Sequence, residues 1–487
     1  MPKLISKDIE KNLDYIRELF EDCYDLIIRE IEIGEVLAVK VAFIYIDGLV
    51  DKEFLSEYAI GSLLQIEEIK TLTEQGYRTT VFEAIKKEGL ATSEIDEVDD
   101  LDEGIDLVLS GDTLLLVDGS DKALQIGTGS WPTRGIDEPS TETVIRGPRD
   151  GFNETLKFST TLIRRRIKDT NLKIEIYTVG RRSKTNVAVM YIKDIVSNSL
   201  IEEVRKRLSD IDIDSVVDSS TLEHLIEDNY LSPFPQIEST ERPDSVAASL
   251  YEGRVALVVD NSPFVLLVPA TIGTFLQSSE DYYTRWLEAS VIRLFRILAV
   301  FLVLLPPALY VAITAYHPGI LPTKLMYFLA ASRIRVPFPA LVEALLMEMT
   351  MELLRESGTR FSGPIGTTIG IVGGLIIGQA AVDAGIVSSL MIIIVAITTI
   401  ATFVIPSYEL SATLRILKFG LIILSGILGL YGITLGVILI GSHLSTLNSF
   451  GAPLTSPYSG LGIKEGDLKD TLVKGPTQKL WLRPGFT

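Results

Sequence analysis

The spacing of hydrophobic residues changes near residue 285 of this 487-residue chain. Before that point, short apolar runs rich in β-branched residues alternate with charged amphipathic segments, which is the pattern of a water-soluble α/β protein. After it, the apolar runs approach or exceed the stretch of about 20 residues that a helix needs to cross a hydrocarbon core. These runs are residues 294–316, 364–382, 386–405 and 414–441. We therefore predict a soluble α/β half followed by an α-helical polytopic membrane domain.

Small residues recur at helical spacing in two of the apolar runs, at every fourth position in residues 364–382 and less regularly in residues 414–441. Glycine costs roughly 1 kcal/mol relative to alanine inside a helix, so such a stripe indicates that something approaches the helix backbone closely. In membranes this spacing marks a helix-packing face; the wall of a narrow pore is the alternative. The candidates for either role are Gly366, Gly370, Gly374, Gly378, Gly429, Gly432 and Gly436.

A fifth segment, residues 337–357, has the pattern of an amphipathic helix that carries acidic residues on one face. Three placements fit this pattern: an interfacial helix with its acids in water, a re-entrant helix, or a helix that lines a watery cavity. Carboxylates inside a membrane tend to be paired or to mark an ion path. The candidate ion path is Glu343, Glu348 and Glu352. Their candidate partners at helical spacing are Arg355 and Arg360.

The number of spans depends on this fifth segment, with four spans if it does not cross and five if it does. Arg285 and Arg293 before the first span, with Arg296 at its start, favour a cytoplasmic N-terminus by the positive-inside rule. Arg415 and Lys418 lie near the start of the last span and are expected to snorkel to the membrane surface. The predicted regions are an N-terminal region with a first α/β subdomain (1–140), a second α/β subdomain (141–285), the membrane domain (286–445) and a tail (446–487).

The soluble half contains an internal duplication. The segment that begins at Val41 (VAFIYIDGLV) resembles the one that begins at Val187 (VAVMYIKDIV), 146 positions later. The segment that begins at Gly111 (GDTLLLVDGS) resembles the one at Gly253 (GRVALVVDNS), 142 positions later. Because both pairs keep the same order at nearly the same offset, we predict two tandem related subdomains. The VDGS and VDNS sequences are typical of strand-ending turns, since Asp, Asn and Gly tolerate positive φ; a ligand-binding loop is the alternative.

The formal net charge of −19 is concentrated in the soluble half and argues against nucleic-acid binding, which needs a basic surface. One basic island interrupts it between residues 146 and 184. Its clustered arginines suit the carboxylates of a neighbouring subunit or anionic lipid headgroups, because each guanidinium presents a planar fork of donors; a solvated face is the alternative. The candidate contact residues are Arg149, Arg164, Arg165 and Arg166.

Signatures of catalysis are scarce. His224, His317 and His443 are far apart, no Cys, His or carboxylate cluster has metal-ligand spacing, and no Gly-x-Ser-x-Gly sequence occurs. We therefore expect no enzyme activity, no metal and no cofactor. The acidic N-terminal region has no signal-peptide pattern and Cys23 has no partner for an intrachain disulfide, so the soluble half is expected to stay in the cytoplasm.

Several short motifs together resemble the GerA family, the A subunits of spore germinant receptors of endospore-forming bacteria. The resemblance covers nearly the whole chain. The motifs are GPRDGF (147–152) with LIRRR (162–166), FPQ (234–236), ERPD (241–244), residues 265–269, QSSEDYY (277–283) and IIGQAAV (376–382).

This resemblance implies a nutrient-sensing complex in the inner membrane of the spore, with the soluble half in the cytoplasm. It implies a permease-like B subunit and a C-subunit lipoprotein as partners. It also implies a homo-oligomeric ring, a pentamer, whose membrane part is a germinant-gated cation channel.

Two alternatives remain. The chain is also similar to the A-subunit-like protein of the SpoVA group (SpoVAF-like), an accessory ion channel of germination; residues 25–30, 467–470 and 483–484 look more like the receptor subunits. A non-conducting signalling scaffold is the other alternative. A secondary transporter is not favoured, because its membrane repeats have no counterpart in this sequence.

Overall fold

The computed structural model describes residues 3–33, 38–55, 82, 95–130, 138–139, 141–360, 378–456, 458, 473–476 and 478. The chain forms two compact units, and each is considered by itself. The sheet unit comprises Met1–Glu227 and Ile237–Pro269, and the helical unit comprises Asp228–Gln236 and Ala270–Phe486. The candidate glycines Gly366, Gly370 and Gly374 lie outside the described residues.

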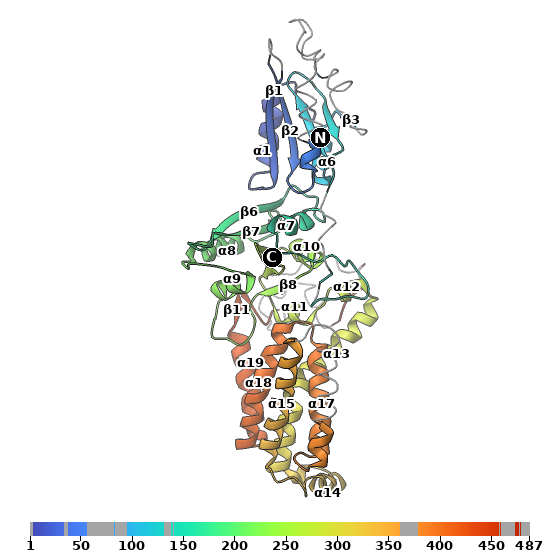
Figure 1. The fold of residues 1–487 in the computed structure, drawn as a ribbon, viewed down its shortest axis with the longest axis vertical. Helices are drawn as coiled ribbons and strands as arrows, with labels where there is room; N and C mark the ends of the chain where they lie inside the picture. Colours follow the sequence, from blue (N-terminus) through green and yellow to red (C-terminus); the bar gives the residue numbers. More distant parts are fainter. Residues whose placement is uncertain are drawn as a thin grey trace. The chain divides into compact units, whose positions relative to one another are not determined.

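The sheet unit contains two five-stranded sheets whose named strands all pair antiparallel (Figure 1). The strands of the first sheet are β1 (Leu26–Ile33), β2 (Val39–Ile46), β3 (Ile95–Val98), β4 (Thr113–Val117) and β5 (Ala123–Ile126). Those of the second are β6 (Leu172–Val179), β7 (Thr185–Ile192), β8 (Glu238–Thr240), β9 (Val255–Val259) and β10 (Val265–Val268). The strand orders, β1-β2-β4-β5-β3 and β6-β7-β9-β10-β8, correspond strand for strand. The prediction of an N-terminal α/β part is confirmed.

The duplicated sequences occupy equivalent places in these two sheets. Val41 of β2 pairs with Val117 of β4, and Val187 of β7 pairs with Val259 of β9. The turns that follow β4 and β9 contain Gly119 with φ of 89° and Asn261 with φ of 66°. These positive φ values are what the VDGS and VDNS sequences predict, so the interpretation as turns is confirmed.

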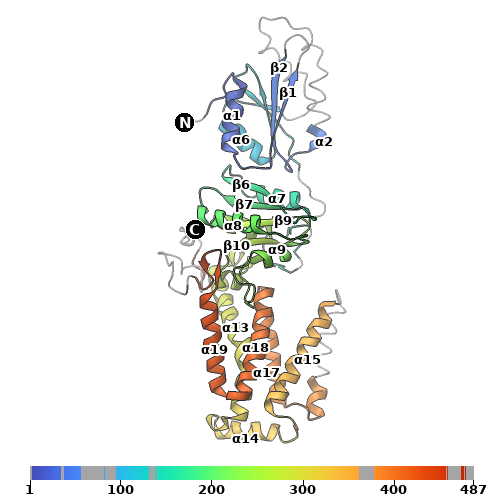
Figure 2. The same ribbon diagram turned by 90° about the vertical axis from the view of Figure 1, so that its left-hand side faces the viewer.

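Helices cover the sheets through alternate strand residues. Helices α1 (Ile9–Leu19) and α6 (Leu101–Ser110) pack on the face of the first sheet that carries Ala42, Ile44 and Ile46 (Figure 2). Asp8 and Asp100 cap the N-termini of these two helices by accepting hydrogen bonds from backbone N–H groups. In the second sheet, α7 (Leu156–Arg164) and α10 (Pro243–Tyr251) cover the face that carries Ala188, Met190 and Ile192. The short α2 (Lys52–Phe54), α8 (Asn198–Asp210) and α9 (Ser219–Ile226) complete the described helices of this unit.

The helical unit is a bundle of apolar helices. Its elements are α11 (Ile272–Leu276), α12 (Glu280–Tyr283), α13 (Trp286–Ala315), the 3-10 turn η3 (Pro318–Ile320), α14 (Thr323–Ser332), α15 (Ala340–Arg360), α17 (Ser389–Val404), α18 (Tyr408–Leu428), α19 (Leu430–Thr446) and the short strands β11 (Asn448–Ser449) and β12 (Ala452–Pro453). Two described helices, α13 and α18, are both long and apolar enough to cross a membrane; α17 and α19 are apolar but shorter. Buried residues of α13, α15, α17, α18 and α19 form one hydrophobic core.

The predicted span 414–441 is wrong in its boundaries, because the structure divides it into α18 and α19 at Gly429. Gly429 has φ of 62° and ψ of −140°, a conformation that ends a helix and that residues with a Cβ rarely adopt. Hydropathy is averaged over a window of residues, so it does not detect a reversal of chain direction at one residue. Gly429 therefore does not belong to a stripe along one continuous helix.

The described part of the tail lies at the same end of the bundle as the start of α13. Ala270 N donates to Ser449 Oγ at 2.9 Å, and Ile272 N donates to Leu454 O at 2.7 Å. The Asp228–Gln236 segment lies at this end as well, because Ser449 Oγ donates to the carbonyl oxygen of Gln236 at 2.6 Å. We call this the loop end of the bundle.

Candidate functional site

Acidic residues of α15 are buried inside the helical unit. The exposed fraction is 0% for Glu343 and 2% for Glu348, and neighbouring Ala344 and Met347 belong to the hydrophobic core. An interfacial helix with its acids in water does not describe this arrangement, because α15 packs against α13, α17 and α18. Each buried carboxylate must then find partners inside the protein.

Glu343 joins four elements at the end of the bundle opposite the loop end. Its carboxylate accepts a hydrogen bond from the backbone N–H of Ser388, the N-cap of α17, at 2.6 Å, and from the Tyr310 hydroxyl of α13 at 3.2 Å. Arg333, the C-cap of α14, places its Nε at 3.4 Å from the same carboxylate. This cluster therefore ties α13, α14, α15 and α17 together through one acidic side chain.

Glu348 and Glu352 pair with the basic residues of α18. Lys418 Nζ lies 2.5 Å from Glu348 Oε2, and Arg415 Nε lies 3.3 Å from Glu352 Oε1. Arg355 is a second partner of Glu352 at 3.4 Å, as its helical spacing predicts. The exposed fractions of Arg415 and Lys418 are 9% and 4%, so the expectation that these side chains snorkel to the surface is wrong. The side chain of Arg360 lies outside the described residues.

A second buried ion cluster lies at the start of α13. Asp281 is 1% exposed and lies 3.1 Å from Arg293 Nε and 2.6 Å from Arg296 Nη1. Lys474 of the tail donates to the Asp281 carbonyl oxygen at 2.6 Å. Two of the arginines that favoured a cytoplasmic N-terminus are therefore engaged within the protein. The tail is held to this region by Lys474, which contacts Asp281 and Ser290.

The glycines of α19 lie against α18. A Cβ on Gly432 would lie 2.1 Å from the carbonyl oxygen of Leu424, and one on Gly436 would lie 2.4 Å from a methyl group of Leu421. A Cβ on Gly378 would make ordinary contact with Ile392 at 3.8 Å. Within this one chain, Gly432 therefore serves a close approach of two helix backbones.

Most of the candidate arginines of the basic island pair with acidic residues of the sheet unit. Arg164 is 1% exposed and donates from Nε and Nη2 to both carboxylate oxygens of Asp25, at 2.8 and 3.0 Å. Arg166 pairs with Asp150, whereas Arg165 is exposed. Exposed Arg149 lies 3.8 Å from Glu138. The expectation that Arg164 contacts lipid or another subunit is therefore wrong, because its guanidinium fixes β1 and its neighbours to α7 instead.

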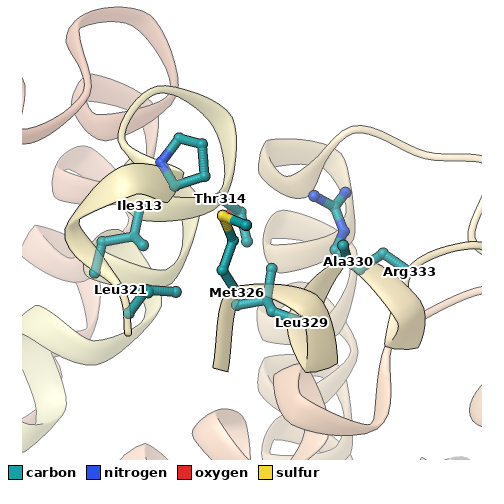
Figure 3. A pocket seen from close by; sticks show the side chains of 8 residues that line it. Ile313, Thr314, Leu321, Met326, Leu329, Ala330 and Arg333 are labelled. Carbon is teal, nitrogen blue, oxygen red and sulfur yellow. The ribbon is translucent and has the colours of Figure 1, made fainter. Parts of the chain in front are cut away.

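A cavity of about 160 Å³ lies where α13 ends and α14 begins (Figure 3). Met326, Leu329 and other apolar side chains line it, and Arg333 forms one side. Small-molecule sites usually span roughly 300–1,000 Å³, so we do not assign a ligand to it. In the described part of the chain, no group of three or more His, Cys, Asp or Glu side chains could hold a metal ion.

The carboxyl group of Glu142, in the sheet unit, has a pKa near neutral pH. Burial raises its pKa from the ordinary 4.5 to about 7, although the Thr240 hydroxyl donates to the carboxylate at 2.6 Å. A raised carboxyl pKa means that the folded state binds more protons than the unfolded state between about pH 4.5 and 7. The free energy of unfolding should therefore fall as the pH rises through this window and level off above it.

We expect Glu142→Gln to remove this pH dependence and to stabilise the protein at pH 8 by up to about 3 kcal/mol, since one pKa unit corresponds to about 1.4 kcal/mol. Urea unfolding of the full chain in detergent at pH 5 and pH 8 measures the difference, with hydrogen exchange of β8 as the local reading. An identical pH slope in the wild type and the variant would contradict the assignment.

Residues 14–486 match the family described as Bacillus/Clostridium GerA spore germination protein. The chain belongs to this GerA family. The family resemblance predicted from the motifs is confirmed.

Two relatives of this GerA-family chain are close along most of its length. It is 43% identical over 467 residues to spore germination protein KA of Bacillus subtilis, covering 95% of this chain and 85% of that protein. It is 41% identical over 482 residues to spore germination protein B1 of Bacillus subtilis, covering 99% of this chain and 97% of that protein. A crystal structure of the N-terminal domain of the A subunit of the Bacillus megaterium spore germinant receptor GerK3 is 32% identical, with a TM-score of 0.44, and covers 56% of this chain and 98% of that chain.

Three motifs that carried the GerA resemblance supply acidic partners for arginines. Asp150 of GPRDGF pairs with Arg166, Asp244 of ERPD lies 2.9 Å from Arg242, and Asp281 of QSSEDYY pairs with Arg293 and Arg296. In this GerA-family chain, Asp150 and Asp281 therefore join their motifs to other segments of the fold, whereas Asp244 and Arg242 pair within one motif. The sequence did not predict Asp25, Asp281 and Lys418 as ion-pair partners. The available indication was the presence of a charged residue inside or beside an apolar run.

Proposed function

We propose that this GerA-family chain is the A subunit of a nutrient germinant receptor in the inner membrane of the spore. Its membrane part oligomerises, as a pentamer, into a germinant-gated cation channel. The names of its relatives, which are spore germination proteins, support the role in germination. A permease-like B subunit and a C-subunit lipoprotein are the proposed partners, with the sheet unit on the cytoplasmic side.

The observation that carries the channel role is the row of acidic residues on α15 with basic partners from α18, inside an apolar bundle. Ionisable residues are expensive in a membrane and occur where they pair or where ions pass. Glu352 is the member that stays within reach of solvent, with a side chain 40% exposed, whereas Glu348 is enclosed. We assign the ion path to the α15 face that carries Glu352. From their spacing in the sequence alone, Gly366, Gly370 and Gly374 stay candidates for helix packing or pore lining.

The exposed surface of the bundle supports the polytopic membrane domain. Large apolar side chains face outward from the middle of four helices: Phe295 and Phe301 of α13, Ile397 and Ile400 of α17, Ile416 and Ile423 of α18, and Ile438 and Leu439 of α19. Aromatic side chains flank this band, with Trp286 and Tyr408 at the loop end and Tyr316, Tyr327 and Tyr431 at the other. Such girdles are typical of the two faces of a bilayer. The 21 residues of α18 span about 30 Å, the thickness of a hydrocarbon core.

We further propose that the two sheets are tandem related subdomains. Their equal strand orders and the matched pairings at offsets of 146 and 142 residues support a duplication. Arg164 and Asp25 then join the two copies through a buried ion pair.

Potassium efflux tests the channel role. The chain would be expressed with its partner subunits in spores, and wild type would be compared with Glu352→Gln and with Glu288→Gln, an exposed acidic residue in the first turn of α13. We expect germinant-triggered efflux to fall several-fold for Glu352→Gln with the oligomer intact, and to be unchanged for Glu288→Gln. Equal efflux from all three assembled proteins would reject the assigned ion path.

A second candidate function is a non-conducting scaffold that signals to a channel elsewhere. The pairing of Glu343 and Glu348 within one chain favours it, because paired carboxylates do not present a ring of negative charge to a pore. A bilayer recording of the purified complex separates the two functions. Current requires the channel, and its absence from an assembled complex that still binds germinant supports the scaffold or a SpoVAF-like partner channel.

A further inference from the structure

The Asp228–Gln236 segment exposes two large side chains next to each other. Tyr230 is 79% and Leu231 78% exposed, the highest values for large hydrophobic residues in this segment. The segment contains no Lys or Arg, and its one acidic residue, Asp228, accepts a hydrogen bond from the backbone N–H of Phe450 at 2.8 Å. An exposed apolar pair without surrounding positive charge points to an apolar partner.

The segment is held firmly to the helices of its own unit. Ser232 Oγ lies 3.0 Å from His443 Nε2 of α19, and the Thr413 hydroxyl of α18 donates to the carbonyl oxygen of Pro233. Phe234 is 4% exposed and belongs to the hydrophobic core of the bundle. Tyr230 and Leu231 are therefore presented by a fixed backbone.

The contacts also fix the level of the segment along the helices. Thr413 lies five residues after the start of α18, about 7 Å along its axis, and His443 lies three residues before the end of α19, about 4 Å along its axis. The polar layer on each side of a hydrocarbon core is about 5–8 Å thick. The segment therefore lies within two helical turns of the ends of α18 and α19 that would meet the headgroup region of a bilayer.

Other exposed aromatic residues mark the same end of the bundle. Tyr408, the first residue of α18, is 69% exposed, and Trp286, the first residue of α13, is 47% exposed. Tyrosine and tryptophan favour the membrane–water boundary because one end of the ring is apolar and the other is hydrated. Tyr230 thus lies at the end of the bundle where other aromatic residues are exposed as well.

We propose that Tyr230 and Leu231 insert into the boundary between headgroups and acyl chains, so that the Asp228–Gln236 segment is a membrane-interface anchor. The anchor rests on the proposed membrane-spanning role of the helical unit. Since the segment has no basic side chain, insertion depends on apolar contact and is equally strong in zwitterionic and anionic bilayers.

Tryptophan quenching by brominated lipids tests this proposal on the full chain in vesicles. Trp131, Trp286 and Trp481 are replaced with Phe, and one reporter is introduced at a time: Tyr230→Trp, Leu231→Trp, Ile438→Trp in the middle of α19, or Tyr24→Trp in the sheet unit. Ile438 is 66% and Tyr24 70% exposed, which matches the exposure of the test positions. Vesicles carry bromine either near the headgroup or deep in the acyl chain, in phosphatidylcholine with or without phosphatidylglycerol.

The expected result is several-fold stronger quenching of Tyr230→Trp and Leu231→Trp by shallow than by deep bromine, with or without phosphatidylglycerol. Ile438→Trp should be quenched by deep bromine and Tyr24→Trp by neither. If Ile438→Trp is quenched but the reporters at positions 230 and 231 are not, the proposed anchor is wrong while the membrane-spanning role stands. In that case, tryptophan emission at short wavelength indicates that the reporter is buried against a second copy of the chain, and emission at long wavelength indicates that it is exposed to water. An unquenched Ile438→Trp overturns the membrane-spanning role and the anchor with it.

Discussion

Replacing Lys418 with Met is expected to lower the free energy of unfolding of the helical unit by about 3–5 kcal/mol, the usual consequence of leaving one partner of a buried ion pair without its counter-charge. The substitution keeps the apolar stem of the side chain and removes the ammonium that lies 2.5 Å from Glu348 Oε2. Thr398 Oγ1, 3.5 Å from the other carboxylate oxygen, is too distant to replace it. Unfolding of the full chain in mixed micelles, followed by circular dichroism, measures the loss.

Two controls separate the ion pair from general damage to the bundle. Lys324→Met removes an exposed lysine of α14 and should change the stability by less than about 0.5 kcal/mol. The double variant Glu348→Gln/Lys418→Met has no buried charge at this position and should regain most of the lost stability. A double variant as unstable as Lys418→Met would show that packing, and not the pairing of charges, holds α15 to α18.

The smallest possible enlargement of Gly432 should be severely destabilising. In Gly432→Ala the new methyl carbon would lie 2.1 Å from the carbonyl oxygen of Leu424, which is backbone and cannot rotate away. Overpacking commonly costs about 1–3 kcal/mol, and a backbone obstacle puts this variant at the upper end or beyond. Thermal unfolding in detergent measures the effect.

Gly441→Ala on the same helix is the matched control, since nothing lies within 4 Å of its Cβ position. Alanine is a better helix former than glycine by about 1 kcal/mol, so this variant should be neutral or more stable. The two substitutions are chemically identical and are expected to act in opposite directions. If both stabilise the protein, the close approach of α18 and α19 does not exist.

Local patterns predicted the strands and turns of the sheet unit well. The repeats at Val41 and Val187 lead to β2 and β7 in matching registers, because alternation of apolar residues and turn chemistry are properties of neighbouring residues. The family followed from motifs spread along the chain. The order of strands within a sheet did not follow, because β3 joins the edge of β5 only through long-range pairing.

The partners of the charged residues were harder to predict. Glu348 and Lys418 are 70 positions apart, and nothing in the surrounding sequence relates them. Arg415 and Lys418 near one end of an apolar run suggest snorkelling, since sequence alone shows distance from the end of the run and not which helix lies alongside. Arg164 suggests an outward basic surface for the same reason: a buried arginine and a solvated arginine look alike until the opposite carboxylate, here Asp25, is placed.

The route of the backbone between the two units limits how the protein can be divided. The chain leaves the sheet unit at Glu227, returns at Ile237 and leaves again after Pro269. A fragment cut after Pro269 would keep Asp228–Gln236 but lose Thr413, His443 and Ser449, which hold that segment. Phe234 would then become accessible, and the fragment is expected to self-associate unless residues 228–236 are replaced by a short polar linker.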